Sequence, residues 1–584
     1  MNMKNMLGNK LLDPRMGGYE MLNLYVEAIT KLNQNPNLPQ LFRDIFKNAY
    51  LPYRDPETLK MFLKTINEFT YDHSERLGDA YEYLLSIMSS QGNAGQFRTP
   101  RHIIDFMVEI VSPQKNETIL DPACGTAGFL ISAYKYILRE NTSEKYKNQN
   151  GNNGNYRADL LSVEEKRNLL DKFNGYDISP DMVRLSLVNM YLHGFVQPRI
   201  HEYDTLTSED KWYEYADVIL ANPPFMTPKG GIRPHKRFSV QSKRSEVLFV
   251  DYIAEHLTPN GRAAVIVPEG IIFQSANAYK SLRKMLVENC LYAVVSLPAG
   301  VFQPYSGVKT SILLMDKQMA KKTDSILFVK IVNDGFDLGA QRKPIDKNDL
   351  PDALKVIKEY IVAIKSGKPE SFVAEKKPCS ALLVKKERIA ENDEYNLTAD
   401  RYRINEKIKH QKWEMVRLGE KTIIKKGTPI TKAQVKKGDI PVIAGGKEPA
   451  YYHNEANRKG NTITISSSGA YAGFINYFKQ PIFASDCTTI QTINEEELNS
   501  DLLFRILKSK QDDFYSFQKG MGQPHVYAKD FQNYLIPLPP IEVQQKIVEE
   551  INKEKEALEK VKLLKANAEK RIEEIISEVW GEKQ

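Results

Sequence analysis

Residues 118–130, TILDPACGTAGFL, contain a short apolar strand, a glycine-punctuated turn and the start of a helix. The strand ends at Asp121-Pro122, and Gly125 and Gly128 open a tight turn into the helix. Glycine lets a backbone approach a ligand closely, and a helix N-terminus favours a carboxylate or a phosphate. The turn lacks the lysine of a phosphate-binding P-loop, and alone it is compatible with many nucleotides. It predicts an α/β domain with a ligand beside this turn.

Short apolar runs alternate with amphipathic stretches around this turn. The runs are TILDPAC, NGYDIS, DVILANPP, RAAVIVPEG, YAVVSLPAG and KTSILLMDK. Strands that alternate with helices form βαβ units and a mainly parallel sheet. We therefore predict that residues 93–330 form an α/β domain.

The regions outside 93–330 differ from it in pattern. Residues 1–92 carry apolar residues at helical spacing and predict a small helical domain. The charged segment 331–410 is interpreted as a connector, and the β-rich, glycine-punctuated segment 411–540 as a further domain. In 541–584 apolar residues recur every three or four positions, which predicts a long helix in a coiled coil. The alternative is an amphipathic helix docked on its own domain.

Composition limits the class of protein. A chain of 584 residues is too long for one ordinary core, and its 42% hydrophobic and 27% charged residues are typical of soluble globular proteins. No apolar run approaches the ~20 residues of a membrane helix, and the N-terminus lacks the apolar core of a signal peptide. The net charge of +7 mildly favours an anionic partner. The cysteines have no metal-like or disulfide-like spacing, so we expect a reducing cytoplasm and no metal. They are Cys124, Cys290, Cys379 and Cys487.

Two further carboxylates follow predicted strands. GYDIS places Asp177 at the end of the next strand, where a carboxylate can accept both ribose hydroxyls of an adenosine. HEYDTL places Asp204 at the end of a third strand, where it can accept a hydrogen bond from an adenine amino group. Each aspartate taken singly is more simply a helix N-cap. Their order at successive strand ends, followed by Asn-Pro-Pro-Phe at a fourth, favours a nucleoside site.

These motifs resemble a known family. DPACGTAGFL followed by NPPF is similar to the S-adenosylmethionine-dependent amino-methyltransferases that act on DNA adenine. GNAGQFRTPRHIIDFMV (92–108) and LPAGVFQPYSGVKTSILLM (297–315) resemble segments of the M subunit of type I restriction–modification systems, although that family usually carries an aromatic where this chain has Arg98. The resemblance implies a Rossmann-like seven-stranded sheet and S-adenosyl-L-methionine as cofactor. It assigns cofactor binding to Phe97, Thr99, Pro100, Asp121, Pro122, Gly125, Gly128, Asp177, Asp204 and Asn222.

The turn Asn222-Pro223-Pro224-Phe225 is then the catalytic segment. Neither proline can donate a hydrogen bond, so the chain must leave the sheet here. The amino group of adenine is a poor nucleophile, because its lone pair is delocalised into the ring. The Asn222 side-chain oxygen and the Pro223 carbonyl would accept its hydrogens and localise that pair. Positioning and preorganised dipoles carry the rate, with no metal or covalent intermediate.

The target base must leave the duplex to reach this turn, and Phe225 gives it a face on which to stack. Phe302 or Tyr305 could cover the other face, and the alternative for both is core packing. The basic, Gly-rich loop after the turn would clamp phosphates, unless it is only a solvated loop. Its candidate DNA contacts are Lys229, Arg233, Lys236 and Arg237.

The C-terminal third carries a second resemblance. WEMVRLGE, SSSGAYAGFINYF and GMGQPHVYAKDFQNYLIPLPPIEVQQKIVEEI are similar to one target-recognition domain and one helix of a type I specificity subunit. That subunit normally has two of each, so the resemblance implies half a specificity subunit fused to a methyltransferase. A homodimer through the helix 541–584 would read two half-sites of double-stranded DNA separated by a spacer. The candidate DNA contacts here are Lys432, Lys436, Lys437, Arg458 and Tyr471.

Three other interpretations stay open. NPPF-type turns also occur in RNA and protein amino-methylases, which resemble neither the N-terminal segment nor residues 411–584. A full restriction enzyme would need a nuclease motif and a motor P-loop, and neither pattern is found, so cleavage would need a separate subunit. A DNA-binding scaffold without activity is disfavoured by the intact Asp121, Asp177 and Asn222.

Overall fold

The computed structural model describes residues 11, 13, 15–52, 54–68, 74–90, 98–149, 156–225, 227, 230–304, 306–339, 341–374, 379–402, 413–469, 471–518 and 525–580. The chain forms two compact units, Met1–Tyr402 and Arg403–Gln584, and each is described by itself. None of the described helices combines the length and the apolarity needed to cross a membrane.

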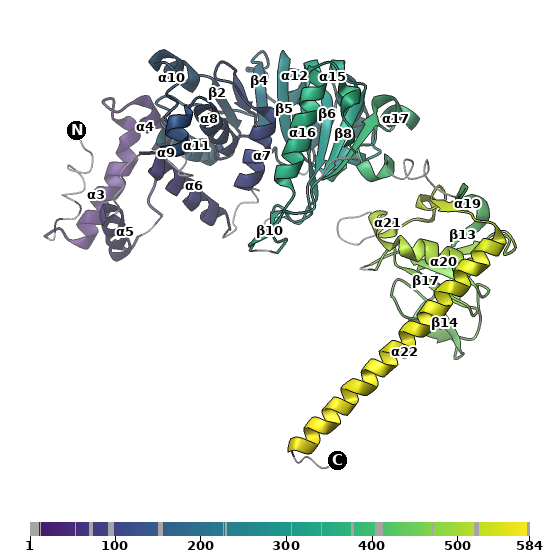
Figure 1. The fold of residues 1–584 in the computed structure, drawn as a ribbon. Coiled ribbons are helices and arrows are strands. Elements are labelled where there is room, and N and C mark those ends of the chain that lie inside the picture. The colour runs from purple at the N-terminus through teal and green to yellow at the C-terminus, as the bar shows by residue number, and fades with distance from the viewer. Residues whose placement is uncertain are drawn as a thin grey trace. The chain divides into compact units, whose positions relative to one another are not determined.

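The first unit is organised around a nine-stranded sheet with the strand order β11-β8-β6-β7-β5-β4-β1-β2-β3 (Figure 1). Strands β1 to β5 are mutually parallel, and β7 runs antiparallel between β5 and β6. The strands are β1 Ile119–Asp121, β2 Phe173–Asp177, β3 Arg199–Glu202, β4 Ala216–Ala221, β5 Leu257–Pro268, β6 Leu291–Ser296, β7 Thr310–Asp316, β8 Ser325–Lys330 and β11 Ser380–Lys385. This mainly parallel sheet confirms the predicted α/β, Rossmann-like class.

Helices cover both faces of this sheet, which explains why strands such as β4, β6 and β7 are nearly continuous apolar runs. Successive side chains of a strand point to opposite faces. Val218 of β4 therefore joins one core with α7, α8 and α16, whereas Ile219 joins another with α12 and α14. These helices are α7 Arg101–Val111, α8 Gly128–Glu140, α12 Ser245–His256, α14 Asn277–Asn289 and α16 Leu350–Lys365.

The segment expected as a connector differs from that expectation. Strand β11 pairs along its whole length with β8 in antiparallel register and extends the sheet. Helix α16 buries Tyr360 completely in the core of the first unit. Residues 331–402 thus add structure to the first unit, and the sheet has nine strands rather than the implied seven. The segment also contains β9 Asp334–Phe336, β10 Pro344–Asn348 and α17 Lys386–Ala390.

The described N-terminal residues are helical, as their apolar spacing predicted. A small core includes Met21, Leu22 and Leu59. Helices α4 and α6 pack against α11 of the α/β domain, and the rings of Phe42 and Tyr191 lie 5.1 Å apart. The helices are α3 Gly18–Lys31, α4 Gln40–Ile45, α5 Pro56–Glu68 and α6 Ser74–Ser90, and the remaining helices of the unit are α9 Glu144–Gln149, α10 Val163–Leu170, α11 Pro180–Leu192, α13 Glu269–Phe273 and α15 Lys317–Lys322.

The second unit combines small sheets with short helices over a core that includes Ile465, Leu503 and Phe514. Its sheets have the orders β13-β19-β16-β17, β15-β14-β18 and β12-β20. The elements are β12 Met415–Arg417, α19 Leu418–Lys421, β13 Thr422–Lys426, β14 Ile440–Ile443, β15 Tyr451–His453, β16 Thr462–Ser466, β17 Ile475–Phe478, β18 Phe483–Ala484, β19 Cys487–Thr492, α20 Ser500–Ser509, α21 Gln511–Ser516 and β20 Leu535–Pro537.

The last helix of the unit is α22 Ile541–Trp580, which has 40 residues and extends away from the rest of the unit (Figure 1). At 1.5 Å per residue it is about 60 Å long. Its start is docked, because the buried Gln544 accepts a hydrogen bond from the Asn499 nitrogen (2.9 Å) and donates to the Glu497 carbonyl (2.8 Å). Further along, Leu558 and Leu564 are 54% and 68% exposed. Among the described residues of the second unit, these seam positions beyond the docked turns are not covered, and neither are Val561 (60% exposed) and Ile572 (56%).

Candidate active site

The carboxyl ends of β1, β2 and β4 meet at one edge of the sheet, because these strands are parallel neighbours. Asp121 is in register with Gly175, and Leu120 pairs with Ile219. Crevices at such strand ends are the usual ligand sites of open α/β sheets. The topology thus gathers the ends of β1 and β2 and the turn after β4.

The loop after β1 has the conformation that its glycine predicted. Gly125 has a φ of +54°, and a Cβ added at this position would find open space within 4 Å. Cys124 donates its N–H to the Tyr176 carbonyl (2.8 Å), so the loop is fastened to β2. Gly128 has another role, because a Cβ there would lie 3.2 Å from Ile104 of α7. Gly125 therefore leaves space for a ligand, and Gly128 allows close helix packing.

Asp121 is only 1% exposed, and its Oδ1 accepts a hydrogen bond from the Ala123 nitrogen (3.1 Å). Burial, followed by the negative charge of Asp177, raises the pKa of the Asp121 carboxyl to about 8. Burial also raises the pKa of Asp177. Because burial disfavours the charged form, both carboxylates would gain from a cationic or hydrogen-donating ligand.

Asp177 joins two loops. Its Oδ2 accepts from the Gly125 nitrogen (3.0 Å) and its Oδ1 from the Ser179 nitrogen (2.8 Å). Each carboxylate oxygen can accept a second hydrogen bond, so the side chain keeps capacity for a ribose. The capping function and the predicted ligand function are thus compatible at this residue.

The Asp204 carboxylate accepts hydrogen bonds from the turn that follows it. Its Oδ1 accepts from the nitrogens of Leu206 (3.0 Å) and Thr207 (3.2 Å), and its Oδ2 accepts from the Thr207 hydroxyl. This is the capping alternative that the sequence left open. The adjacent Thr205 donates to the Pro122 carbonyl (2.8 Å), which ties this turn to the loop after β1.

Asn222 follows β4 directly. Its Nδ2 donates to the hydroxyl of Thr99 at 2.9 Å, and its Oδ1 is buried without a hydrogen-bond partner in the described part of the chain. Buried acceptors are nearly always satisfied, and an exception needs an explanation. The arrangement presents an oriented amide oxygen that lacks a donor.

The rest of the turn separates into buried and accessible parts. Pro223 is buried. Pro224 is exposed, and the Pro224 carbonyl accepts a hydrogen bond from the Ser245 hydroxyl (3.4 Å). Phe225 is half-buried and packs against the core that contains α7 and α8. Phe302 is 2% exposed and belongs to that same core. In this structure Phe302 therefore packs in the core, which is the alternative to base stacking that the sequence left open.

Among the other predicted cofactor and stacking residues, Thr99 is 7% exposed and Pro100 precedes the first residue of α7. Phe97 and Tyr305 lie outside the described residues, as does Lys229. The basic loop leaves Arg233 and Lys236 exposed, whereas the Arg237 guanidinium pairs with Glu209 at 3.2 Å.

Glu246 is a site-bordering residue that sequence reasoning missed. It is buried at the start of α12, where it accepts from the Tyr279 hydroxyl (2.6 Å) and the Thr227 hydroxyl (3.4 Å). These bonds anchor the chain that follows Phe225. A charged residue inside the apolar run SEVLFVDYIAEH was the available signal.

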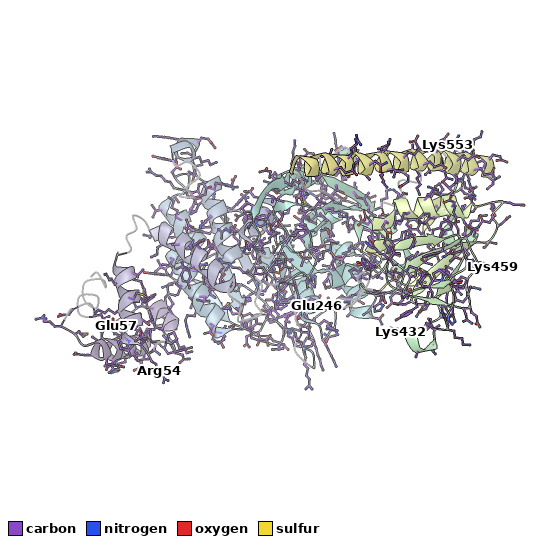
Figure 2. The ribbon with its side chains drawn as sticks, turned by 90° about the horizontal axis from the view of Figure 1, so that it is seen from below. Arg54, Glu57, Glu246, Lys432, Lys459 and Lys553 are labelled. Carbon is purple, nitrogen blue, oxygen red and sulfur yellow. The ribbon has the colours of Figure 1, made fainter. Side chains whose placement is uncertain are left out.

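The predicted contacts of the second unit are mostly exposed. Lys432, Lys436 and Lys437 all face solvent, and the side chains of Lys432 and Lys459 extend outward from the unit (Figure 2). Arg458 differs, because its guanidinium donates to Thr489 Oγ1 (2.9 Å) and to the carbonyls of residues 457 and 426 (both 2.8 Å). Tyr471 is 44% exposed, and the Lys447 ammonium lies 4.9 Å from its ring centre.

A group of possible metal ligands lies elsewhere in the described chain. Ligand atoms of Asp79, Glu82 and His193 lie within 4.8 Å of one another. The Lys135 ammonium, however, is 2.5 Å from Asp79 and 3.7 Å from Glu82. A lysine already neutralises these carboxylates, so we interpret the group as an ion-pair network between helices.

The sheet order, the loop after β1 and the acceptors at its carboxyl edge define a methyltransferase-type α/β fold. The chain belongs to the N-6 DNA methylase family, whose model matches residues 72–411. A second model, the type I restriction modification DNA specificity domain, matches residues 410–567. The resemblance stated from the motifs is thereby confirmed.

Individual relatives agree with this assignment. The chain is 34% identical over 287 residues to the methylase subunit of the type I restriction enzyme EcoEI from Escherichia coli, covering 48% of this chain and 55% of that subunit. A chain solved in a study of the assembly of a type I R-M system is 27% identical, with a TM-score of 0.53 over 68% of this chain and 79% of that one. A type I methyltransferase subunit from Streptococcus thermophilus, 22% identical with a TM-score of 0.50 over 68% of this chain and 78% of its own, shows the fold alone. The chain spans only about half the length of the EcoEI subunit.

Proposed function

We propose that this chain is an S-adenosylmethionine-dependent methyltransferase that modifies the N6 amino group of adenine in DNA. The observation that carries the proposal is Asn222 Oδ1, a buried acceptor without a donor in the described part of the chain, at the carboxyl edge of β4. An adenine amino group would supply the missing donor. The proposal agrees with the N-6 DNA methylase family of residues 72–411.

The site suits a cofactor of this kind. Asp177 lies beside Gly125, where a Cβ would meet open space, and Asp121 ends the strand before this loop; two carboxylates here disfavour a polyphosphate. A nucleoside with ribose hydroxyls and cationic groups meets acceptors instead. When bound, S-adenosylmethionine would supply an electrophilic methyl group on a positively charged sulfur. Asp177 would accept from the ribose, and Asp121, Pro122 and Gly125 belong to the end of β1 and the loop beside it.

The chain's own residues would prepare the nucleophile. The Asn222 oxygen, with the Pro223 carbonyl, would accept hydrogen bonds from the amino group and localise the nitrogen lone pair. The half-buried ring of Phe225 would stack on the flipped base and hold it in line with the methyl group. The nitrogen would gain the methyl group as the bond from that methyl to sulfur breaks, the sulfur would leave as a neutral thioether (S-adenosylhomocysteine), and one proton of the amino group would pass to water. A preorganised acceptor of this type contributes on the order of 100-fold or more in rate.

The second unit would supply sequence recognition. It matches a type I specificity domain and holds exposed lysines together with a helix on which the described seam residues Leu558 and Leu564 are exposed within the unit. We propose that two copies pair through α22 and read two half-sites of double-stranded DNA separated by a spacer. Its relatives are named as subunits of type I restriction enzymes. Restriction would then require a separate nuclease or motor subunit, and the protein would act on DNA in the cytoplasm.

The decisive experiment is single-molecule sequencing of DNA incubated with the purified protein and S-adenosylmethionine. The expected result is N6-methyladenine at one bipartite, two-fold symmetric sequence. Methylation of RNA or protein but not DNA would replace the proposal by one of the other amino-methylases. Cofactor binding without methyl incorporation into DNA, RNA or protein would favour the scaffold interpretation.

A further inference from the structure

The hydroxyl of Thr99 lies 2.9 Å from Nδ2 of Asn222, a residue 123 positions later in the chain. Thr99 is 7% exposed, so water has little access to this contact. The family resemblance implied that Thr99 binds the cofactor. In the structure its hydroxyl holds the amide whose oxygen is left without a donor among the described residues.

Thr99 is itself held on both sides. The neighbouring Arg98 donates from Nη1 to the main-chain carbonyl of Glu82 (3.1 Å). Arg101 donates from its Nη1 to the Glu82 carboxylate (2.9 Å). Glu82 belongs to α6, so this N-terminal helix fixes the segment that presents Thr99. Arg98, which stands where the related family usually has an aromatic, thus has a structural role.

The orientation of the Asn222 amide decides what it offers to a base. The amide oxygen accepts hydrogen bonds, whereas the amide nitrogen carries two hydrogens and only donates. If the amide turned by 180°, it would present hydrogens to the hydrogens of the target amino group. While the Thr99 hydroxyl accepts from the amide nitrogen, as it does here, the amide oxygen stays directed towards the place of the base.

We infer that Thr99 is a positioning residue that orients the Asn222 amide for the attack, with Glu82 of α6 holding the Thr99 segment in place. This inference rests on the proposed function and deepens it. The N-terminal helices then do more than extend the fold, because they fix one end of the catalytic geometry. Thr99 acts through Asn222 and not through the transferred methyl group.

The test compares Thr99→Val, which is nearly isosteric but lacks the hydroxyl, with Thr99→Ser, which keeps it. We expect Thr99→Val to lower kcat about 10-fold to 100-fold, as is typical for residues that orient a reacting group. The Kd for S-adenosylmethionine should stay within about twofold, and Thr99→Ser should restore most of the rate. The matched control is Thr142→Val, because Thr142 is also buried and hydrogen-bonded (2.7 Å to the Leu138 carbonyl), in the turn that follows α8 of the same unit.

A double variant separates positioning from general damage. If Thr99 acts through Asn222, the Thr99→Val/Asn222→Ala protein is no slower than Asn222→Ala alone. Thr99→Ala takes the place of Thr99→Val if the valine protein does not fold. A wild-type kcat for Thr99→Val would overturn the inference, as would a weakened cofactor affinity with an unchanged kcat. An active Asn222→Ala protein would instead defeat the proposed function, so the two failures are distinguishable.

Discussion

The main-chain nitrogen of Gly125 donates a hydrogen bond of 3.0 Å to Oδ2 of Asp177, 52 residues further along the chain. The bond joins the loop after β1 to the end of β2, and the other oxygen of Asp177 fixes Ser179 at the start of α11. The carboxylate proposed to bind the ribose therefore also shapes the loop that borders the cofactor space.

Replacement of Asp177 by alanine should weaken S-adenosylmethionine binding. The lost charge-assisted hydrogen bonds correspond to about 1–3 kcal/mol, which calorimetry would detect as a raised Kd. Asp177→Asn is the matched variant, because it keeps an acceptor for Gly125 but loses the charge. Its Kd should lie between those of the wild type and Asp177→Ala. Unchanged affinity in both variants would mean that Asp177 only caps the two loops.

Asn222→Ala should show the opposite pattern. The proposed acceptor faces the base and not the cofactor, so the methylation rate should fall on the order of 100-fold or more. The Kd for S-adenosylmethionine should remain nearly unchanged. Calorimetry beside a methyl-incorporation assay checks both quantities. Asn189→Ala provides a comparison, because Asn189 is a buried amide of the same unit whose Nδ2 donates to the Thr126 carbonyl (2.8 Å).

Cofactor affinity should rise with pH. The pKa of Asp121 in the free protein is raised to about 8 by burial and by Asp177, so at neutral pH the carboxyl is mostly protonated. If the cofactor binds the ionised form, each pH unit below about 8 should cost up to about tenfold in affinity. Above that pH the affinity should level off. Asp121→Asn cannot ionise and should flatten the profile; a wild-type profile without slope would contradict the assignment.

The same shift has a consequence for stability. A carboxyl whose pKa is raised in the folded state binds its proton more tightly there than in the unfolded chain. The free energy of unfolding of the cofactor-free protein should therefore fall as the pH rises from about 4 towards 8. Denaturant unfolding at several pH values measures this slope. Asp121→Asn should reduce it, with the remainder due to other groups such as Asp177, whose pKa is also raised.

Truncation within α22 tests the proposed assembly. A stop after Asn552 keeps Gln544 and the contact from Arg505 to Asn552 (2.7 Å), so the recognition domain should stay folded. The protein should become monomeric in light scattering, keep its cofactor affinity and lose most affinity for a two-half-site target. Truncation after Pro540 would also remove Gln544 and should destabilise the domain.

Point variants test the same seam in the intact helix. Leu558→Glu with Leu564→Glu should dissociate the dimer, because both side chains are exposed in the single chain and lie on the repeating apolar positions. Lys560→Glu changes the charge of a neighbouring exposed position and should leave the dimer intact. A dimer that survives both the truncation and the leucine variants would show that the pairing surface lies elsewhere.

The basic residues of the second unit should fall into two groups, DNA-contacting lysines and a structural arginine. Replacing Lys432, Lys436 and Lys437 together by alanine should weaken DNA binding across sequences and reduce the slope of log affinity against log salt by up to about 3, if each lysine contacts one phosphate. Arg458→Ala should instead lower the unit's unfolding free energy by about 1–3 kcal/mol, because its guanidinium makes three internal hydrogen bonds. Equal salt slopes for the wild type and the triple variant would exclude these lysines as contacts.

The sequence alone predicted the elements whose pattern is local. Strands β1 and β4 were predicted because strands buried on both faces are continuous apolar runs, and β1, β2 and β4 each end at or directly before a polar residue at the carboxyl edge of the sheet. Gly125 was predicted as a turn residue, and its φ of +54° is one that few other residues adopt. The order of these motifs was sufficient to place the chain in its family.

The tertiary structure decided which distant segments meet. Strand β11 joins the sheet through pairing with β8, some fifty positions earlier, and no local pattern in a charged segment indicates that partner. The tertiary structure also decided the role of Phe302, which the sequence could place either in the site or in the core and which lies in the core. It likewise decided the role of Arg458, whose guanidinium donates hydrogen bonds inside the unit. Thr99 and Asn222 are 123 residues apart, and only the packing of α7 beside β4 brings the hydroxyl to the amide. The spacing of apolar residues shows which face of a helix or strand is buried. Which other element covers that face depends on contacts between segments that are distant in the sequence.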